Sequence, residues 1–347
     1  MPLSVLLLSP LRKPSGNHST VQRIRTHLES GNLVCQEWDP ADFDNEDEFL
    51  RKLAEKNVDL IIALHAYKAG KFLSDKVPIP YIVIFGGTDV NQFYKDGDKL
   101  LKMSRTLVSA RYIVAFSQEM WDKALIIWPH VDKSKLTIIK QGIQTRPSSL
   151  RLREYLVNQG HVTSSSVAGA AIFLFVGSIR PVKDPLFLVR TMAEWHRERT
   201  DILYVIIGPK HEEDYFTEFH EAIDREDGII YLGEMSIEDT HACMRDSSVL
   251  VNTSESEGMA AVILESMDLG TPVMARRNGG NEALIQHNVT GFLFSTPQEF
   301  KEIANAFIKD TAVRREITQA AKAQILRDHS PKIERDAYHK LINDLKH

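Results

Sequence analysis

Short, continuous apolar runs alternate with longer amphipathic stretches along the whole chain. Continuous apolar runs are typical of strands that are buried on both faces of a parallel sheet. The stretches between them, such as 19–29 and 46–56, have the period of helices, and this alternation favours βαβ units and a doubly wound α/β fold. We predict strands at 5–9, 58–64, 81–85, 112–116, 136–140, 172–176, 203–207, 229–232, 249–252, 272–275 and 292–294.

The alternation occurs twice, which indicates two Rossmann-like domains. A chain of 347 residues is long enough for each domain to bury its own core. Between the halves, 144–171 is rich in Ser, Arg and Gly, and 164–166 is its most linker-like portion. We therefore predict domains 1–147 and 148–330. Ligands of such folds bind beyond the carboxyl ends of the strands, so we expect the two domains to face one interdomain cleft.

Composition narrows the possible partners and location. The 42 Lys and Arg against 47 Asp and Glu give a net charge of −5, which argues against a general nucleic-acid binder. No stretch approaches the ~20 apolar residues of a membrane span. The apolar run near the N-terminus is shorter than the ~7–15 residues of a signal core, so we read it as a strand and expect a cytoplasmic protein with unused glycosylation sequons at Asn17, Asn252 and Asn288.

Two features bear on metal and redox chemistry. Cys35 and Cys243 are far apart, fit no zinc spacing, and are expected to be buried small hydrophobes. Asp42 and Asp44, like Asp96 and Asp98, have the Asp-x-Asp spacing of cation-dependent transferases, but neither pair follows a convincing strand. Runs of charge are usually solvated surface, so we predict no metal and no cofactor.

The segment after strand 249–252 carries the most chemistry. A helix is predicted from about 260 to 269, with Gly270 and Pro272 as its stop signals. Free N–H groups at its start suit a diphosphate or sugar hydroxyls, and Gly258 permits close approach of a ligand. Glu265 inside the helix can accept both hydroxyls of a ribose. The alternative is an amphipathic helix in which Glu257 and Glu265 are simply solvated.

The residues that follow are more specific. Glu257 and Glu265 precede Gly270-x-Pro272-Val273, then Gly279-Gly280-x-x-Glu282, then Thr290-Gly291-Phe292-Leu293. This block resembles the donor site of glycosyltransferase family 4, whose members have the GT-B architecture. Residues 175–183 resemble the family's Val-Gly-Arg-…-Lys loop, 139–143 its Ile-Pro-Asn-Gly-Val strand end, and 6–16 its first strand and glycine loop, so the likeness spans almost the whole chain.

The resemblance implies a retaining glycosyltransferase that needs no metal and takes a nucleotide-diphosphate sugar as donor. Glu265 would hold the ribose, Glu257 would face the donor sugar, and Lys183 would neutralise the diphosphate. Backbone amides would come from Gly258, Met259, Ala260 and Ala261, and the base would be met by Gly233, Glu234 and Met235. In the family the terminal helix, here 331–347, packs back on the first domain.

The chain departs from the family pattern in two places. Ser178 stands where the family usually has Arg, and Arg180 follows two positions later, so Arg180 either reaches the diphosphate or is a surface residue. Gly86 stands where relatives usually have a His that contacts the donor sugar. His65, at the end of strand 58–64, either faces the cleft or is structural.

On the acceptor side, the resemblance implies a role for Gly16, in the glycine loop after the first strand. His65 and Asp89 are further acceptor-side candidates, and the alternative for Asp89 is a capping or turn role. The acceptor itself is not identified by the sequence. The two departures leave open a second hypothesis, a binding or regulatory protein that keeps the donor pocket without efficient turnover. An oxidoreductase is disfavoured, because no Gly-x-Gly-x-x-Gly follows a strand.

Overall fold

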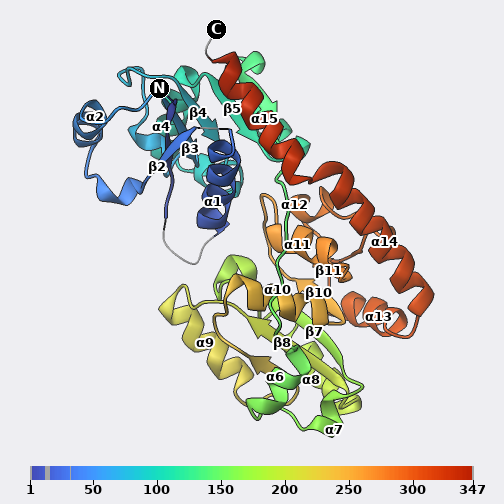
Figure 1. Cartoon of the computed structure of the whole chain (residues 1–347). Coiled ribbons are helices and arrows are strands. Elements are labelled where there is room, and N and C mark those ends of the chain that lie inside the picture. Colours follow the sequence, from blue (N-terminus) through green and yellow to red (C-terminus); the bar gives the residue numbers. More distant parts are fainter. Residues whose placement is uncertain (1, 12–15, 32, 346–347) are drawn as a thin grey trace. The chain divides into compact units, whose positions relative to one another are not determined.

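The computed structural model describes residues 2–11, 16–31 and 33–345, and the chain divides into two compact units. Unit 1 comprises Met1–Gly142 and His329–His347, and unit 2 comprises Ile143–Asp328. Each unit is a six-stranded parallel sheet with its own hydrophobic cores, flanked by helices (Figure 1). The predicted pair of doubly wound α/β domains is confirmed.

In unit 1 the strand order is β2-β1-β3-β4-β5-β6, and every neighbouring pair is parallel. The order reverses between β1 and β3, which makes that point of the sheet the place where a crevice opens in folds of this kind. The elements are β1 (Ser4–Leu8), α1 (Gly16–Glu29), β2 (Val34–Trp38), η1 (Pro40–Asp42), α2 (Glu46–Ala54), β3 (Leu60–Leu64), η2 (Gly70–Phe72), β4 (Tyr81–Ile84), α3 (Gly87–Asn91), η3 (Phe93–Lys95), α4 (Gly97–Ser109), β5 (Tyr112–Ala115), α5 (Gln118–Ile127), η4 (Lys133–Lys135), β6 (Leu136–Ile138) and α15 (Pro331–Asp344).

In unit 2 the order is β12-β11-β10-β7-β8-β9, again all parallel, with the reversal between β7 and β10. This is the strand order of dinucleotide-binding folds. The elements are α6 (Leu152–Asn158), α7 (Ser164–Val167), β7 (Ala171–Val176), η5 (Pro181–Lys183), α8 (Val189–Glu198), β8 (Ile202–Ile207), α9 (Glu213–Ile223), β9 (Ile229–Tyr231), α10 (Ile237–Asp246), β10 (Val249–Asn252), α11 (Ala261–Leu269), β11 (Val273–Arg276), α12 (Gly279–Glu282), β12 (Phe292–Phe294), α13 (Pro297–Phe307) and α14 (Thr311–Asp328).

The predicted apolar runs form strands in both units, and the central ones, such as β3 and β8, are buried along their whole length. The sequence pattern did not predict β2, at the edge of the unit 1 sheet. Its polar residues Gln36 and Glu37 are only half-buried, so it lacks the continuous apolar run of a central strand. Cys35 lies on the same edge strand and is half-buried rather than buried as predicted, whereas Cys243 is fully buried.

The segment 144–171 is not a linker, contrary to the prediction. It contains the short helices α6 and α7, and Thr163 caps α7 with a reciprocal capping box to Ser166. Leu152, Leu156 and Val167 are buried in a core of unit 2. The first boundary lies at Gly142 rather than 147 because the chain after it already packs into unit 2, where the Thr145 hydroxyl donates to Asp268.

The last helix belongs to unit 1. Helix α14 ends at Asp328, Pro331 begins α15, and α15 packs against α1. The fully buried carboxylate of Glu334 is the centre of this contact, because one oxygen accepts from Arg23 Nε and His27 Nε2 at 2.8 Å each. The same oxygen accepts the N–H of Gly142 at 2.9 Å. The second crossing between units therefore comes at Asp328, just before the terminal helix.

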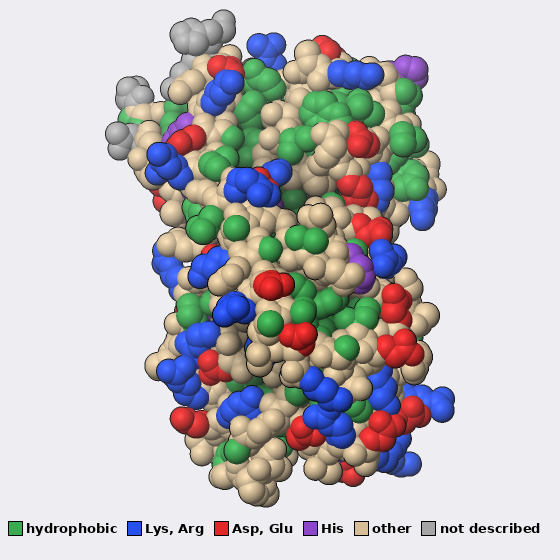
Figure 2. Space-filling view, turned by 90° about the vertical axis from the view of Figure 1, so that its right-hand side faces the viewer, with side chains coloured by type: hydrophobic (Ala, Val, Ile, Leu, Met, Phe, Trp, Pro, Cys, Tyr) green, Lys and Arg blue, Asp and Glu red, His purple; other side chains and the backbone are tan. Residues whose placement is uncertain are grey.

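None of the helices in the described part of the chain has the length and apolar character needed to cross a membrane. Basic and acidic side chains are interspersed on the face drawn in Figure 2, and hydrophobic side chains lie between them. This mixed surface agrees with the small net charge of the sequence.

Candidate donor site and its relatives

Most of the predicted donor residues follow two neighbouring strands of unit 2. Ser178, Arg180 and Lys183 come after β7, and Glu257 to Ala261 come after β10. These strands are adjacent at the point where the strand order reverses. Because ligands of open parallel sheets bind outside the carboxyl ends at this point, the topology gathers the predicted residues where a nucleotide would be expected.

Helix α11 begins at Ala261 without a side-chain cap, because Ala260 at the N-cap position has no hydrogen-bonding side chain. The nearby helices α10, α12 and α13 are capped by Ser236, Asn278 and Thr296. The first N–H groups of α11 are thus the ones that a bound anion or hydroxyl could satisfy. Gly258 and Met259 before it are half-buried, while Ala260 is buried.

Lys183 and Glu257 form an ion pair between the two loops. Glu257 is 9% exposed, and the same Oε1 also accepts from Ser254 Oγ at 2.6 Å and Asn252 Nδ2 at 3.4 Å. Burial opposes ionisation of this carboxyl, yet Lys183 and these hydrogen bonds together hold its pKa below the usual value. The two residues that the sequence assigned to diphosphate and sugar are therefore bonded to each other here.

The loop that carries Lys183 is tied to the end of β10. Thr253 Oγ1 donates to the carbonyl oxygens of Lys183 and Asp184, at 3.0 and 2.7 Å, and the Glu255 N–H donates to Val182. Asp184 has a left-handed backbone with φ 43°, and its carboxylate pairs with Arg276 at 2.8 Å. Burial raises the pKa of Asp184 against the effect of that pairing. Lys183 is thus held by a strained, cross-linked turn.

Two glycines allow neighbouring segments to approach these loops closely: Gly280 in α12 and Gly208 after β8. A Cβ on Gly280 would lie 2.3 Å from the carbonyl oxygen of Glu257, and one on Gly208 would lie 1.8 Å from that of Gly177. Gly208 also has φ 158°, a conformation that residues with a side chain rarely adopt. The sequence pattern includes Gly280 in a motif and gives no signal for Gly208.

Glu265 lies inside α11, and its side chain is 23% exposed. Its Oε2 is 3.9 Å from Nε2 of His241 on α10, and that nitrogen is buried without a hydrogen-bond partner in the described structure. The other ring nitrogen, Nδ1, accepts the N–H of Arg146 at 3.2 Å. Nε2 of His241 is therefore a polar atom close to Glu265 that makes no hydrogen bond of its own with the described residues. No sequence pattern pointed to His241.

The remaining donor-side predictions differ in exposure. Ser178 and Arg180 are half-buried, and Nε of Arg180 is a buried atom without a hydrogen-bond partner among the described residues. Gly233 has φ 74° and its carbonyl accepts the N–H of Gly208, which joins the loop after β9 to the end of β8. Glu234 is exposed, whereas Met235 packs on a core of unit 2, with its sulfur 3.9 Å from that of Cys243.

In unit 1, His65 follows β3 at the reversal point of the sheet. It is 6% exposed and has a left-handed backbone, φ 77°, which is uncommon for a residue with a side chain. Its Nε2 bonds to Oδ1 of Asn17 at 3.0 Å. Gly86 lies beneath the ring, because a Cβ there would be 1.7 Å from Nδ1 of His65. The imidazole thus fills the space that a side chain at position 86 would need.

Asp89 is fully buried, and its carboxylate accepts the N–H groups of Gly86 and Ala66 at 2.8 Å and Tyr67 at 3.2 Å. As positioned, it caps α3 and anchors the loop after β3, which corresponds to the capping alternative rather than to direct contact with an acceptor. Gly16 is exposed at the first residue of α1, and no atom of the described residues lies within 4 Å of the place that a Cβ would take there.

The acidic runs serve local structure. Asp96 caps α4 by accepting the N–H groups of Asp98 and Lys99, and Asp39 caps η1. Within residues 2–11, 16–31 and 33–345, no three His, Cys, Asp or Glu side chains converge in a way that could hold a metal ion. The predicted metal independence of the reaction stays a prediction.

The sequence of this chain is similar to those of known glycosyltransferases. Residues 162–324 match the model of the glycosyl transferases group 1. The chain is 38% identical over 346 residues to the glycosyltransferase 1 domain-containing protein 1 of Xenopus tropicalis, and the match covers 99% of both. The matched family segment contains the β7 loop, the β10 loop and α11, so the similarity includes the candidate site.

Solved structures supply the architecture. HepE of Anabaena, in complex with UDP and glucose, superposes with a TM-score of 0.82 at 20% identity, covering 99% of this chain and all of that one. Sucrose-phosphate synthase of Thermosynechococcus elongatus superposes with a TM-score of 0.80 at 16% identity, covering 99% of each chain. These neighbours have the predicted GT-B fold. The chain belongs to the group 1 glycosyltransferases, and it is a glycosyltransferase of the GT-B fold.

Proposed function

We propose that this enzyme transfers a sugar from a nucleotide-diphosphate sugar to an acceptor with retention of anomeric configuration and without a metal ion. The observation that carries the donor assignment is the uncapped start of α11, with the Lys183–Glu257 ion pair in the loop before it, at the reversal point of the unit 2 sheet. Anions bind where free N–H groups and a helix dipole point at them. That HepE was solved with UDP and glucose supports testing UDP-sugars first.

In this proposal the diphosphate draws Lys183 away from Glu257. The N–H groups at the start of α11 and the Lys183 ammonium then neutralise the charge that develops on the departing phosphate, with Arg180 as a second cation. Glu257, released from Lys183, accepts a hydroxyl of the donor sugar. Glu265 accepts the ribose hydroxyls, and the loop of Gly233, Glu234 and Met235 borders the base.

The reaction needs no nucleophile from the protein. The bond between the anomeric carbon and the phosphate oxygen breaks, and the acceptor oxygen bonds to that carbon on the same face. The acceptor proton passes to the leaving phosphate. Lys183 and Arg180 would take the role that a divalent cation has in other transferases, and this is the basis for proposing metal independence. A cytoplasmic location remains part of the same proposal.

Donor binding is tested by thermal unfolding with UDP-, GDP- and ADP-sugars, since a ligand at 100 times its Kd stabilises the folded state by about 2.7 kcal/mol. We expect one nucleotide class to raise Tm and Glu265→Gln to abolish the rise. Glu316→Gln, at an exposed position on α14, is the matched control and should keep it. A rise retained in Glu265→Gln would refute the ribose assignment.

Retention and metal independence have their own tests. Proton NMR of the product should show the anomeric configuration of the donor, and the rate should be unchanged by EDTA. An inverted product or a rate lost to the chelator would contradict the respective part of the proposal.

A second candidate function is donor binding without efficient turnover. The ion pair between Lys183 and Glu257 favours it, because both groups must separate before they can serve a substrate. Ser178 in place of the usual Arg supports it as well. Donor binding with neither transfer nor hydrolysis across an acceptor library would establish this function instead.

A further inference from the structure

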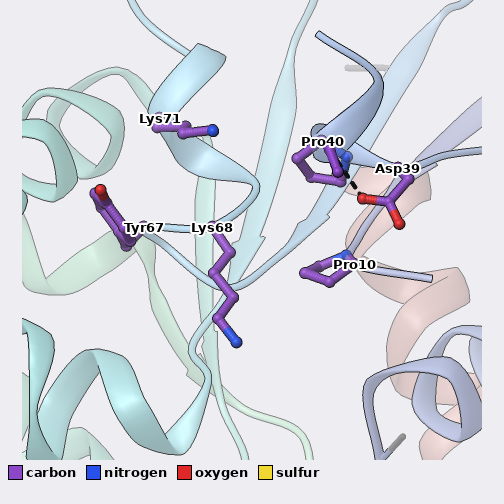
Figure 3. A pocket seen from close by; sticks show the side chains of 7 residues that line it. Pro10, Asp39, Pro40, Tyr67, Lys68 and Lys71 are labelled. Carbon is purple, nitrogen blue, oxygen red and sulfur yellow. Dashed lines mark hydrogen bonds between the residues drawn. The ribbon is translucent and has the colours of Figure 1, made fainter. Parts of the chain in front are cut away.

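Unit 1 has a hollow of about 210 Å³ whose lining includes Asp39, Lys68 and Lys71 (Figure 3). The charged side chains of this lining already have partners within the unit. Both carboxylate oxygens of Asp39 accept backbone N–H groups, and the ammonium groups of Lys68 and Lys71 lie over aromatic rings. The lining therefore points to no particular ligand, in contrast to one buried side chain of unit 2.

His241, on α10, has a buried ring nitrogen that makes no hydrogen bond with the described residues. The side chain is 5% exposed, and this nitrogen, Nε2, lies 3.9 Å from Oε2 of Glu265 on α11. Helix α10 packs against α11, so the imidazole lies beside the helix that carries the candidate donor residues. A buried polar nitrogen without a partner costs folding free energy, which indicates a role beyond stability.

The other ring nitrogen of His241 determines where the proton lies. Nδ1 accepts the N–H of Arg146 at 3.2 Å. A ring nitrogen that accepts a hydrogen bond carries no proton, so the neutral imidazole has its proton on Nε2. His241 therefore presents an N–H donor, rather than a lone pair, near Glu265.

The backbone that fixes this tautomer is held on both sides of Arg146. Thr145 donates its N–H and its hydroxyl to Oδ2 of Asp268 on α11, at 3.2 and 2.6 Å. The N–H of Ser148 donates to the carbonyl of Glu238 on α10 at 2.9 Å. The segment thus binds both helices, and the imidazole cannot turn over without losing the hydrogen bond from Arg146.

Glu265 differs from the next carboxylate on the same face of α11. Asp268, three residues later, is occupied by Thr145. Glu265 is 23% exposed and accepts no hydrogen bond from the described residues. A glutamate side chain without such a bond loses rotamer freedom when it binds a ligand, and this loss lowers affinity. A donor that orients the carboxylate beforehand reduces that loss.

We propose that His241 is a positioning residue for the donor nucleotide, whose Nε2–H orients the carboxylate of Glu265 toward the ribose. One lone pair of the carboxylate accepts from His241, and the others accept the ribose hydroxyls. The 3.9 Å separation shortens to hydrogen-bond length in the complex, as such contacts commonly do when a substrate binds. The inference rests on the proposed function, in which Glu265 holds the ribose.

The test is the preference for ribose over 2′-deoxyribose. Isothermal titration calorimetry on the full chain gives the Kd of UDP, GDP and ADP and of their 2′-deoxy counterparts. We expect wild type to bind its preferred ribonucleotide about tenfold more tightly than the 2′-deoxy form, because the latter lacks a hydrogen bond to a charged group. His241→Leu should lower this ratio by about threefold to tenfold, the range of one hydrogen bond.

Two further variants separate positioning from a structural role. Asparagine places its amide oxygen near the position of Nδ1, so His241→Asn keeps an acceptor for Arg146 but lacks the Nε2–H donor. Glutamine places its amide nitrogen near the position of Nε2, so His241→Gln should restore the ratio that His241→Asn loses. Urea denaturation reports the stability of each variant. Glu238→Gln, at an exposed position on the same helix, is the matched control and should keep the wild-type ratio.

A wild-type ratio in both His241→Asn and His241→Leu would overturn the positioning role. An equal loss in all three variants, in step with their stability, would overturn it as well and leave His241 a structural residue. If the variants do not fold, ¹⁵N NMR of wild-type His241 decides. A protonated Nε2 whose resonance shifts when the preferred nucleotide is added supports the proposal, whereas a protonated Nδ1 or an unchanged Nε2 overturns it.

Failure of the proposed function gives a different result. If wild type binds none of the nucleotides, or if Glu265→Gln keeps the full ribose preference, the ribose assignment itself is wrong and the positioning role falls with it. If Glu265→Gln loses the preference while His241→Asn and His241→Leu keep it, the ribose assignment stands and only the role of His241 is refuted.

Discussion

The imidazole of His65 lies directly over Gly86, so that a Cβ on Gly86 would be 1.7 Å from Nδ1 of the ring. His65 has φ 77° and is almost fully buried, so its ring has little room to move aside. The family pattern predicts a histidine at position 86. In this chain the ring of His65, from the end of the neighbouring strand, fills the space that a side chain at position 86 would need. We infer that His65 and Gly86 are a coupled pair.

Gly86→Ala should destabilise the protein by about 1–3 kcal/mol, the usual cost of overpacking a buried position. The same change in a His65→Gly background should cost far less, because the ring is gone and glycine accepts the left-handed backbone. Urea denaturation of the four proteins of this cycle measures the coupling. Gly97→Ala, where a Cβ meets no described atom within 4 Å, controls for the added methyl group. Additive effects would contradict the coupling.

Lys183→Met should destabilise the protein by on the order of 3 kcal/mol, because it leaves the carboxylate of Glu257 buried without its cation. Lys183→Met/Glu257→Gln should recover part of that loss, since no uncompensated charge remains. Chemical denaturation measures the stability of both variants. Nucleotide titration should show that neither binds the donor, because both lack Lys183. If the double variant is no more stable than Lys183→Met, the two side chains are not energetically paired.

Glu334→Gln should lower the free energy of unfolding by about 3–5 kcal/mol at neutral pH. It removes the carboxylate that Arg23 and His27 share where α1 packs against α15. Although burial opposes it, Arg23 and His27 lower the folded-state pKa of Glu334 below its usual 4.5. A depressed pKa stabilises the folded state above the unfolded value, and this stabilisation is lost as pH falls through the folded pKa.

The difference between wild type and Glu334→Gln should therefore be constant above about pH 5 and shrink below about pH 4.5, which denaturation at several pH values measures. Asp336→Asn, at an exposed position on α15, is the control: its stability difference from wild type should not change with pH by a comparable amount. A difference that grows on acidification would contradict the sign.

Gly208→Ala should cost about 3 kcal/mol or more, because its Cβ would lie 1.8 Å from a backbone oxygen of Gly177 that no rotamer change can move. The displaced loop carries Ser178, Arg180 and Lys183, so donor affinity should fall with stability. Gly169→Ala, at an exposed site where no described atom lies within 4 Å of the added Cβ, should leave both unchanged. If Gly208→Ala binds the donor with full affinity, the loop after β7 is not part of the donor site.

The sequence by itself determined the alternation of buried strands and helices, and with it every strand of the two sheets except β2. Continuous apolar runs identify central strands because both faces of those strands are covered. Edge strand β2 escaped prediction, since one side of it meets solvent and its residues Gln36 and Glu37 need not be apolar. The helix at 261–269 was predictable because its stop signals, Gly270 and Pro272, are local in sequence.

Only the tertiary structure decided which distant residues meet. Lys183 and Glu257 belong to separate loops, and their pairing depends on β7 and β10 being neighbours in the sheet. The same holds for His65 over Gly86, which follow adjacent strands β3 and β4. Local propensities act over a few residues, whereas these contacts depend on strand order, on the glycines that permit close approach, and on the charges that burial forces to pair.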